Sequence, residues 1–233
     1  TVTISSITGD GTLGITLAAG TAKDLAGNSA LATPASSTVS IKNTENITLM
    51  LTPGWNLASC MVEFNASEVF GDSTTYASVW KWLASEKRWE VYLPTDPDNG
   101  EAYAKSKGFE LLSTVLPGEG FWVNVQSDKP PTTDIRGELA KDPSLALAKG
   151  WNLLGLKSGQ SLWIEDRSDA EKTAIESLWK WKGKEKKWAV SLPNAPDGDG
   201  GQAYADSKGF TLLESIDPGE GFWVNANEAI TLP

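Results

Sequence analysis

Tryptophan is the most prominent side chain in this sequence that could bind a ligand. The chain has 233 residues, and its aromatic side chains are 11 Trp, 6 Phe and 4 Tyr. Ten Trp form five pairs at matching places in the two halves of the chain: Trp55/Trp151, Trp80/Trp179, Trp82/Trp181, Trp89/Trp188 and Trp122/Trp223. Indole rings on one strand face can stack on the apolar faces of sugars while their N–H groups donate to hydroxyls.

The paired Trp residues also have a structural interpretation. Five indoles that bury roughly 150–250 Å² each would supply most of the core of a small domain. Each half of the chain has few other large apolar residues, so we expect the paired rings to form the cores. Trp163 has no counterpart and stands in a polar stretch of the second half. We therefore expect Trp163 to be exposed, and it is the candidate for stacking on a ligand.

A lysine-rich segment follows the Trp179 position. Residues 179–190 are predicted to form a hairpin with Gly183 near its tip. Strand alternation places Trp179 and Trp181 on one face and Lys180 and Lys182 on the other. These two lysines are candidate ligands for an anionic polysaccharide, although outward lysines more often protect a hairpin edge from pairing with another strand.

Acidic loops offer oxygen ligands of the kind that calcium prefers. The candidates lie in a turn near the N-terminus and in one loop of each half: Asp24, Asn28, Asp96, Asp98, Asp197 and Asp199. None of these loops has the twelve-residue pattern that ends in Glu and marks a strong calcium site. Solvated turns explain the same residues. Calcium is the one cofactor for which the sequence has candidate ligands.

Catalytic side chains are scarce. The chain has no His and one cysteine, Cys60, which excludes imidazole bases, Ser-His-Asp triads and disulfides within the chain. Cys60 stands among apolar residues and is expected to be buried. Glu119 and Glu220 occupy identical PGEG turns, but a glycosidase needs two carboxyls in one cleft, and these belong to separate halves. We predict no enzymatic activity and no catalytic residues.

An internal duplication organises most of the chain. Residues 106–124 and 207–225 are identical at 14 of 19 positions, and the motifs GWNL and WKW also recur upstream. The sequence therefore predicts two homologous units, 47–128 and 145–233. The segment 129–144 between them contains paired prolines, which favour an extended linker.

The expected fold is mainly β with short helices. Residues 1–43 contain no aromatic residue and are predicted to form strands near 1–7, 13–17 and 39–41. Within the repeats we expect a strand at each GWNL motif, a strand over 121–124 and a helical segment over 103–107 that ends at Gly108. A helix over 170–176 is expected behind the capping residues Ser168 and Asp169.

Two stretches resemble known modules. The head, SSITGDGTLGITLAAGTAKDLAGNSA followed by STVSI, resembles the closing strands of immunoglobulin-like repeats in secreted bacterial adhesins. That resemblance implies that earlier strands are missing and that an edge is open for pairing. The succession GWNL, VWKW and PGEGFWVN is similar to a repeat near the C-terminal ends of multidomain secreted and surface proteins of bacteria and archaea. It implies a modular, extracellular context and no shared catalytic activity.

The combined prediction is a non-enzymatic extracellular segment. The net charge of −10 disfavours nucleic acid, no apolar stretch reaches the roughly 18 residues of a membrane span, and a chain that begins with Thr1 is expected to be a processed product or a fragment. We predict a structural or adhesive part of a cell-surface or secreted protein. One form of this prediction is a filament subunit that assembles by strand pairing with copies of itself or with neighbouring domains. The alternative is a carbohydrate-binding module with exposed Trp and a surface polysaccharide as partner.

Overall fold

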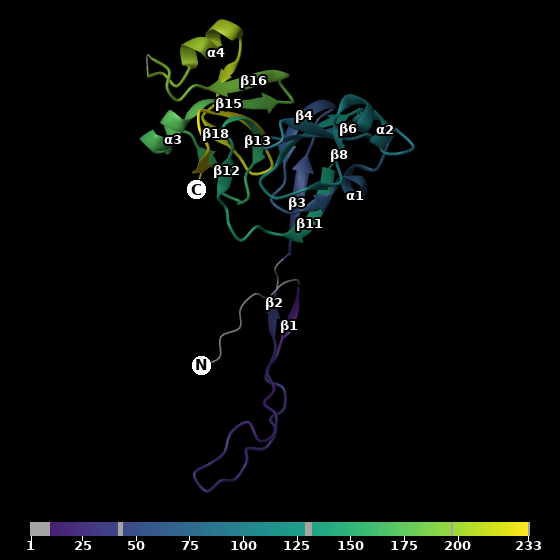
Figure 1. Cartoon of the computed structure of the whole chain (residues 1–233), viewed down its shortest axis with the longest axis vertical. Coiled ribbons are helices and arrows are strands. Elements are labelled where there is room, and N and C mark those ends of the chain that lie inside the picture. The colour runs from purple at the N-terminus through teal and green to yellow at the C-terminus, as the bar shows by residue number, and fades with distance from the viewer. Residues whose placement is uncertain (1–9, 42–43, 129–131, 197, 233) are drawn as a thin grey trace. The chain divides into compact units, whose positions relative to one another are not determined.

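The computed structural model describes residues 10–41, 44–128, 132–196 and 198–232 (Figure 1). The chain divides into two compact units, Thr1–Thr44 and Glu45–Pro233, and each is described by itself. The strand expected over residues 1–7 lies outside the described residues. Over the described residues the fold is mainly β with four short helices, which confirms the predicted fold class.

The N-terminal unit is a thin hairpin. Strand β1 (Gly11–Leu13) pairs antiparallel with β2 (Val39–Ile41). Residues 14–38 form two irregular arms, in which the N–H of Thr33 donates to the Leu17 carbonyl at 3.0 Å. The expected strand therefore ends at Leu13 instead of continuing to Leu17. No described residue in 10–41 is buried, so this part of the chain has no hydrophobic core.

The second unit consists of two repeats with the same sheet topology. The main sheet of repeat 1 has the strand order β4-β10-β6-β7-β8, and that of repeat 2 has β13-β19-β15-β16-β17. Neighbours are antiparallel except for the last pair in each sheet, which is parallel. The strands are β4 (Gly54–Ser59), β6 (Tyr76–Leu83), β7 (Arg88–Tyr92), β8 (Glu110–Leu111), β10 (Gly120–Val125), β13 (Gly150–Gly155), β15 (Ile175–Lys182), β16 (Lys187–Ser191), β17 (Thr211–Leu212) and β19 (Gly221–Ala226).

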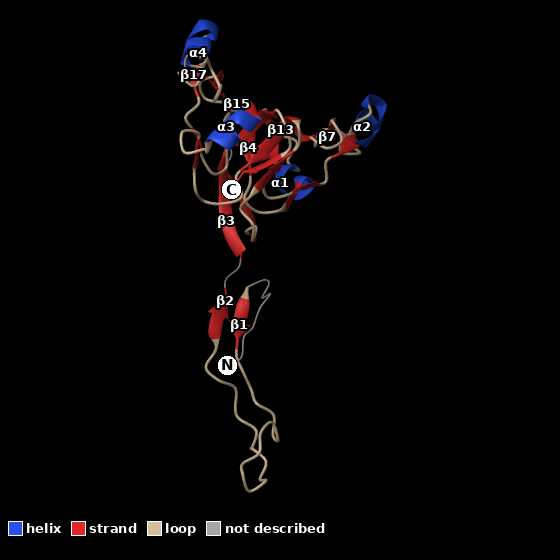
Figure 2. Cartoon of the chain, turned by 60° about the vertical axis from the view of Figure 1, so that its left-hand side comes forward, coloured by secondary structure: helices blue, strands red, loops and turns tan. Residues whose placement is uncertain are grey.

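Additional strands and the four short helices of the described residues surround the main sheets, and Tyr103 of one helix and Tyr204 of another contact Trp80 and Trp179. The additional strands pair as β3 (Thr44–Met50) with β11 (Thr132–Glu138), β5 (Phe64–Asn65) with β9 (Thr114–Val115), β12 (Leu145–Leu147) with β20 (Ile230–Leu232), and β14 (Leu162–Trp163) with β18 (Ser215–Ile216). The helices are α1 (Ala66–Phe70), α2 (Glu101–Lys107), α3 (Asp169–Ala174) and α4 (Gln202–Lys208). In Figure 2, α2 and α4 lie at opposite ends of this unit, with β4 and β13 between them.

Local sequence signals account for the helix ends. Ser168 accepts a hydrogen bond from the Glu171 N–H, and the Glu171 carboxylate accepts one from the Ser168 N–H, so together they form a capping box for α3. Gly108 ends α2 in the left-handed conformation with φ of 72°, which glycine adopts without steric cost. These observations confirm both expected helices, although α3 ends at Ala174 instead of residue 176, because β15 begins at Ile175.

The predicted linker is partly wrong. Residues 132–138 form β11, which pairs with β3, and Ile135 is 3% exposed within the core of repeat 1. The hydroxyl groups of Tyr76 and Thr133 lie 2.6 Å apart in a buried hydrogen bond. Repeat 1 therefore extends from 45 to 138, because the segment after its Trp-rich part returns to close its core. The connection to repeat 2 is short, because Leu139 still forms a β-bridge with Val62 of repeat 1 and β12 of repeat 2 begins at Leu145.

The core of each repeat contains Phe and aliphatic residues and no described Trp. On β10, Phe121, Val123 and Val125 point into the core, and Phe121 contacts Phe64 and Phe70. Cys60 is fully buried, as expected, and burial raises the pKa of its thiol. The prediction that the paired indoles form the cores is wrong, because strand alternation sends Trp122 to the opposite face of the sheet from Phe121.

Reciprocal contacts join the two repeats. The Ser59 N–H donates to the Gly219 carbonyl at 2.9 Å, and the Gly155 N–H donates to the Gly118 carbonyl at 3.0 Å. Two isolated β-bridges between the repeats show the same reciprocity. Ala58 pairs with Glu220, and Leu154 pairs with Glu119. A Cβ on Gly120 would lie 2.4 Å from the Leu154 carbonyl oxygen, and one on Gly221 2.4 Å from that of Ala58. Each of these contacts therefore occurs twice, the second time with the equivalent residues of the two repeats exchanged. This is what an internal two-fold relation produces.

Candidate functional site

The ten paired Trp residues lie on one face of the two main sheets, and we call this surface the Trp face. Backbone register aligns them: Trp122 is opposite Trp80, and Trp82 is opposite Trp89. Repeat 2 shows the same alignment, with Trp223 opposite Trp179 and Trp181 opposite Trp188. Trp55 on β4 and Trp151 on β13 complete the set on the neighbouring strands. The alternation predicted from the WKW motifs is therefore confirmed.

Indole rings meet across the boundary between the repeats. Trp122 lies 6.3 Å from Trp181 and 5.8 Å from Trp188 between ring centroids. The reciprocal contacts of Trp223 are 6.4 Å to Trp82 and 5.9 Å to Trp89. These are tilted or edge-to-face arrangements, the geometry that aromatic pairs favour. The rings thus help to join the two repeats at their boundary.

Four indole N–H groups on the Trp face are used within the protein. Trp181 donates to the Trp55 carbonyl at 2.9 Å, and Trp82 donates to the Trp151 carbonyl at 3.0 Å. Trp80 and Trp179 donate to Ser78 and Ser177 in their own repeats. Within the described residues, the other six indole N–H groups have no acceptor: Trp55, Trp89, Trp122, Trp151, Trp188 and Trp223. These six N–H groups are free to donate to a ligand.

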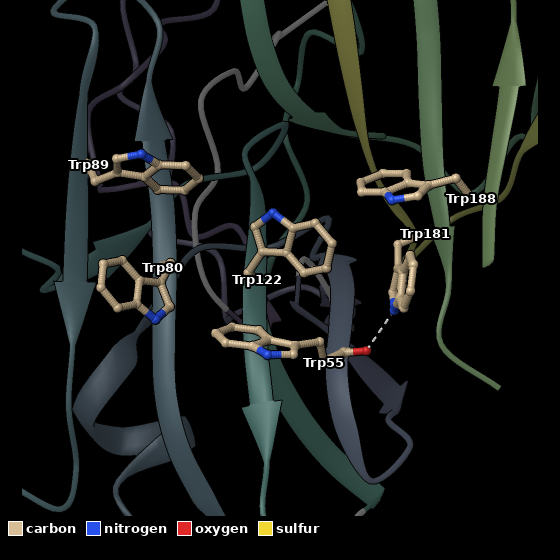
Figure 3. Close-up of a pocket in the computed structure, with 6 residues that line it drawn as sticks. All are labelled: Trp55, Trp80, Trp89, Trp122, Trp181 and Trp188. Atoms are coloured by element: carbon tan, nitrogen blue, oxygen red, sulfur yellow. Dashed lines mark hydrogen bonds between the residues drawn. The ribbon is translucent and has the colours of Figure 1, made fainter. Parts of the chain in front are cut away.

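Two shallow pockets open on the Trp face. The first has a volume of about 360 Å³ and is lined by Trp55, Trp80, Trp89, Trp122, Trp181 and Trp188 (Figure 3). The second, of about 420 Å³, is lined by Trp82, Trp89, Trp151, Trp179, Trp188 and Trp223. Trp55 is 44% exposed and Trp151 is 46% exposed, and the other eight rings are half-buried. The paired rings therefore face solvent across an aromatic surface.

The two pockets have an aromatic lining. Their described lining offers ring faces and N–H donors and contains no carboxylate, amine, hydroxyl or thiol side chain. Such a lining can hold flat apolar surface and donate hydrogen bonds. It places no general acid, general base or nucleophile beside a bound molecule.

The expected outward orientation of Lys180 is wrong. Lys180 is 9% exposed, and its Nζ lies 2.7 Å from Glu220 Oε2 and 3.2 Å from the Ser215 carbonyl oxygen. Alternation separates Trp and Lys as predicted, but the Lys side is the covered side of the sheet. Lys182 is half-buried near the hairpin turn, with its Nζ 3.4 Å from Glu185. The two candidate lysines do not form a common cationic surface.

The two PGEG glutamates stabilise their turns. Glu119 Oε2 accepts from the Leu116 N–H and the Lys81 ammonium, and Glu220 Oε2 accepts from the Asp217 N–H and the Lys180 ammonium. Each turn also carries the backbone that contacts the other repeat. A structural role for the glutamates follows from these contacts.

The candidate calcium ligands described by the structure lie in turns and helix caps. The backbone N–H groups of Ala102 and Gly100 donate to Asp98 and lower its pKa, and Asp199 accepts equivalent bonds from Ala203 and Gly201.

The side-chain amide of Asn28 donates to Asp24, and this bond together with the Asn28 backbone bond lowers the pKa of Asp24. Asp96 is half-buried in its loop, and Asp197 lies outside the described residues. No group of three or more Asp, Glu, Cys or His that could hold a metal occurs among the described residues.

Trp163 is exposed as predicted, at 45%, but it does not belong to the Trp face. It lines a separate pocket of about 420 Å³ in repeat 2, together with side chains that include Glu165, Lys172 and Glu214. The equivalent position on β5 of repeat 1 is Asn65, since Trp163 is opposite Ser215 and Asn65 is opposite Thr114. Repeat 1 therefore lacks this pocket's aromatic side chain.

The sequence contained a signal for the Trp face. In residues 121–125, FWVNV, three apolar residues alternate with Trp122 and Asn124, so the strand has a Phe and Val side that suffices for a core. The ten paired Trp residues do form one group in the structure, but the expectation that they form the cores is wrong.

Comparisons with known proteins add no assignment. No family model matches the chain, and neither curated proteins nor solved structures show a significant match. The resemblances of the head and of the repeats therefore stay predictions. Among the described residues, every helix is too short to cross a membrane.

Proposed function

We propose that this chain is a non-enzymatic, extracellular binding segment of a modular surface or secreted protein, and that its Trp face binds polysaccharide. The observation that carries the proposal is the pair of solvent-facing pockets lined by ten Trp residues. Apolar surface is costly to expose to water. For that reason, exposed apolar patches in soluble proteins usually mark interaction sites.

Carbohydrate fits the chemistry of this lining. The β-1,4-linked polymers of glucose and N-acetylglucosamine carry equatorial hydroxyls, which leave flat C–H faces that pack on indole rings. Hydroxyl oxygens at the ring edges can accept from the free indole N–H groups. The extracellular location rests on the resemblance of the repeats and on the acidic composition. Binding of a surface glycan is also a simple physical basis for adhesion.

The test uses sedimentation with insoluble chitin and cellulose and calorimetric titration with chitotetraose and cellotetraose. We expect the full chain to bind at least one of these glycans. The double variant Trp55→Ala/Trp151→Ala removes the two most exposed rings of the Trp face and should weaken binding at least tenfold, about 1.4 kcal/mol.

The control variant is Trp163→Ala, which removes an equally exposed ring outside the Trp face. It should bind as tightly as the unmodified chain. Absence of binding to all four probes by the unmodified chain contradicts the proposal. Loss of binding in Trp163→Ala with retention in the double variant would move the site to the separate pocket of repeat 2.

The N-terminal unit supports a second proposal, strand pairing with another copy or a neighbouring domain. Among the described residues β1 and β2 pair only with each other, and Leu17 and Leu31 are 49% and 86% exposed. A strand edge that no described residue covers, in a unit that also exposes these leucines, favours addition of a strand, as in a surface filament. Analytical ultracentrifugation should show association with rising concentration that Leu17→Lys/Leu31→Lys abolishes, whereas a monomer at every concentration contradicts this role.

A further inference from the structure

We infer that the Trp face holds two equivalent binding pockets and that the protein therefore binds two glycan segments at once. This inference rests on the proposed function and specifies its stoichiometry. It follows from the correspondence between the repeats, from the residues that line each pocket and from the direction of a polysaccharide chain.

Each pocket takes side chains from both repeats. The first pocket has four rings from repeat 1 and two from repeat 2, Trp181 and Trp188. The second has four rings from repeat 2 and two from repeat 1, Trp82 and Trp89. A separated repeat would lack two of the six rings of its pocket. Duplication within one chain is therefore what completes both sites.

The two pockets are exchanged by the internal symmetry. Replacing every residue of the first pocket by its partner in the other repeat yields the lining of the second pocket without omission or addition. The hydrogen bonds between the repeats show the same correspondence. The backbone bond of Ser59 has its counterpart at Gly155, and the indole bond of Trp82 has its counterpart at Trp181. A closed, reciprocal set of contacts requires a two-fold relation, so the two pockets have corresponding linings, and we expect them to bind with similar intrinsic affinity.

Two-fold symmetry determines how a polymer can fill the pockets. A polysaccharide has a reducing and a non-reducing end, so its chain has a direction. A strand that passes straight from the first pocket to the second keeps its direction, whereas a two-fold operation reverses a direction perpendicular to its axis. The second pocket would then meet the chain backwards. Equivalent occupancy of both pockets therefore requires two glycan segments.

Bivalent binding has a functional consequence. One protein molecule can hold two polysaccharide strands, or two places on one folded strand, and thereby cross-link a glycan matrix. Linked sites also raise the apparent affinity for a polymer above that for a short oligomer, through effective concentration. The shared rings Trp89 and Trp188 border both pockets, which keeps the two strands close together.

The test is calorimetric titration of the full chain with chitotetraose and cellotetraose, followed by two single variants. Trp55 lines only the first pocket and Trp151 only the second. We expect two sites in the unmodified chain, one remaining site of similar affinity in Trp55→Ala, and one in Trp151→Ala. The double variant should bind at least tenfold more weakly at both sites, and Trp163→Ala should keep two sites of unchanged affinity.

A second readout uses the polymer. Mixing the unmodified chain with soluble glycol chitin or hydroxyethyl cellulose should raise turbidity through cross-linking, and each single variant should bind without raising it. Circular dichroism and urea midpoints establish that the variants are folded, and Trp55→Phe and Trp151→Phe serve if an alanine variant is not.

The possible outcomes separate the two proposals. One site in the unmodified chain, or loss of all binding in a single variant, overturns the two-pocket inference and leaves glycan binding intact. No binding of the unmodified chain to any probe overturns the proposed function and this inference with it.

Discussion

The two repeats share a topology but differ in how they neutralise the lysine beneath the main sheet. In repeat 1 the Lys81 ammonium lies 2.8 Å from Glu90 and 2.9 Å from Glu119. In repeat 2 Ala189 stands opposite Lys180, where Glu90 stands opposite Lys81. Within the described residues, Glu220 is the only carboxylate paired with Lys180. Both repeats thus keep the carboxylate of the turn, which indicates that the essential task of the lysine is to hold the turn that contacts the other repeat.

The repeats also differ at the helix that follows the first short strand. Helix α3 begins with a complete capping box, whereas α1 begins after Asn65 without a side-chain cap. In repeat 1 the first residue of the helix is held by a backbone hydrogen bond from the Ala66 N–H to the Ser113 carbonyl at 2.9 Å, and the fully buried Phe70 packs into the core. The same fold therefore tolerates different local supports, provided that the core and the boundary between the repeats are kept.

The largest effect is expected where the repeats agree. Phe121 and Phe222 are fully buried at equivalent positions, so Phe121→Ala and Phe222→Ala should each lower the free energy of unfolding by about 3–5 kcal/mol. Urea denaturation measures the loss. Trp163→Ala, at an exposed site, should stay within about 0.5 kcal/mol. A loss under 1 kcal/mol in one Phe variant would show that the cores are not equivalent.

The buried lysines should show the difference between the repeats most directly. Lys81→Met leaves two carboxylates without their cation and should cost about 3 kcal/mol, whereas Lys180→Met leaves one, more exposed, carboxylate and should cost about half as much. Comparison of urea midpoints tests the order. The control is Lys182→Met, whose lysine is half-buried near the turn and should matter little. An equal cost for Lys81 and Lys180 would exclude a role for Glu90.

The helix caps predict a smaller difference that depends on pH. Ser168→Ala should cost about 1 kcal/mol, and Asn65→Ala, which removes no cap bond, clearly less. Burial by itself raises the pKa of Glu171, but the hydrogen bonds from Ser168 and the charge of Arg167 outweigh it and lower that pKa.

The charged form of Glu171 consequently contributes stability above the ordinary pKa of a glutamate, and that contribution disappears as the pH falls through the lowered pKa. The cost of Ser168→Ala, measured by denaturation at several pH values, should be largest near neutral pH and shrink in acid. A cost that grows on acidification would contradict the capping role.

The smallest effect concerns the bonds between the repeats. Trp82→Phe and Trp181→Phe each remove one indole N–H bond to the other repeat and should cost about 0.5–1 kcal/mol more than the matched control Trp89→Phe, whose N–H has no acceptor among the described residues. The two losses should agree, because the bonds are exchanged by the two-fold relation. A clear inequality in their denaturation midpoints would show that the two indole bonds do not contribute equally to joining the repeats.

Local sequence signals predicted a large share of this architecture. The duplication, the hairpin around Gly183, the Gly108 helix end and the separation of Trp from Lys along a strand all follow from residue spacing and side-chain size. These features depend on neighbours within a few residues, or on identity between two stretches, and both can be read along a chain.

The tertiary structure decided which face of each sheet is inside. Alternation assigns Trp122 and Phe121 to opposite faces, but it does not say which face the remaining strands and helices cover. In repeat 1 residues 132–138 return to β3 and close the Phe121 side, so Lys81 is buried with its carboxylates and the Trp residues stay open. Burial is a property of the covering layer, which comes from distant segments. For that reason the sequence by itself determined the two faces, and only the fold determined their roles.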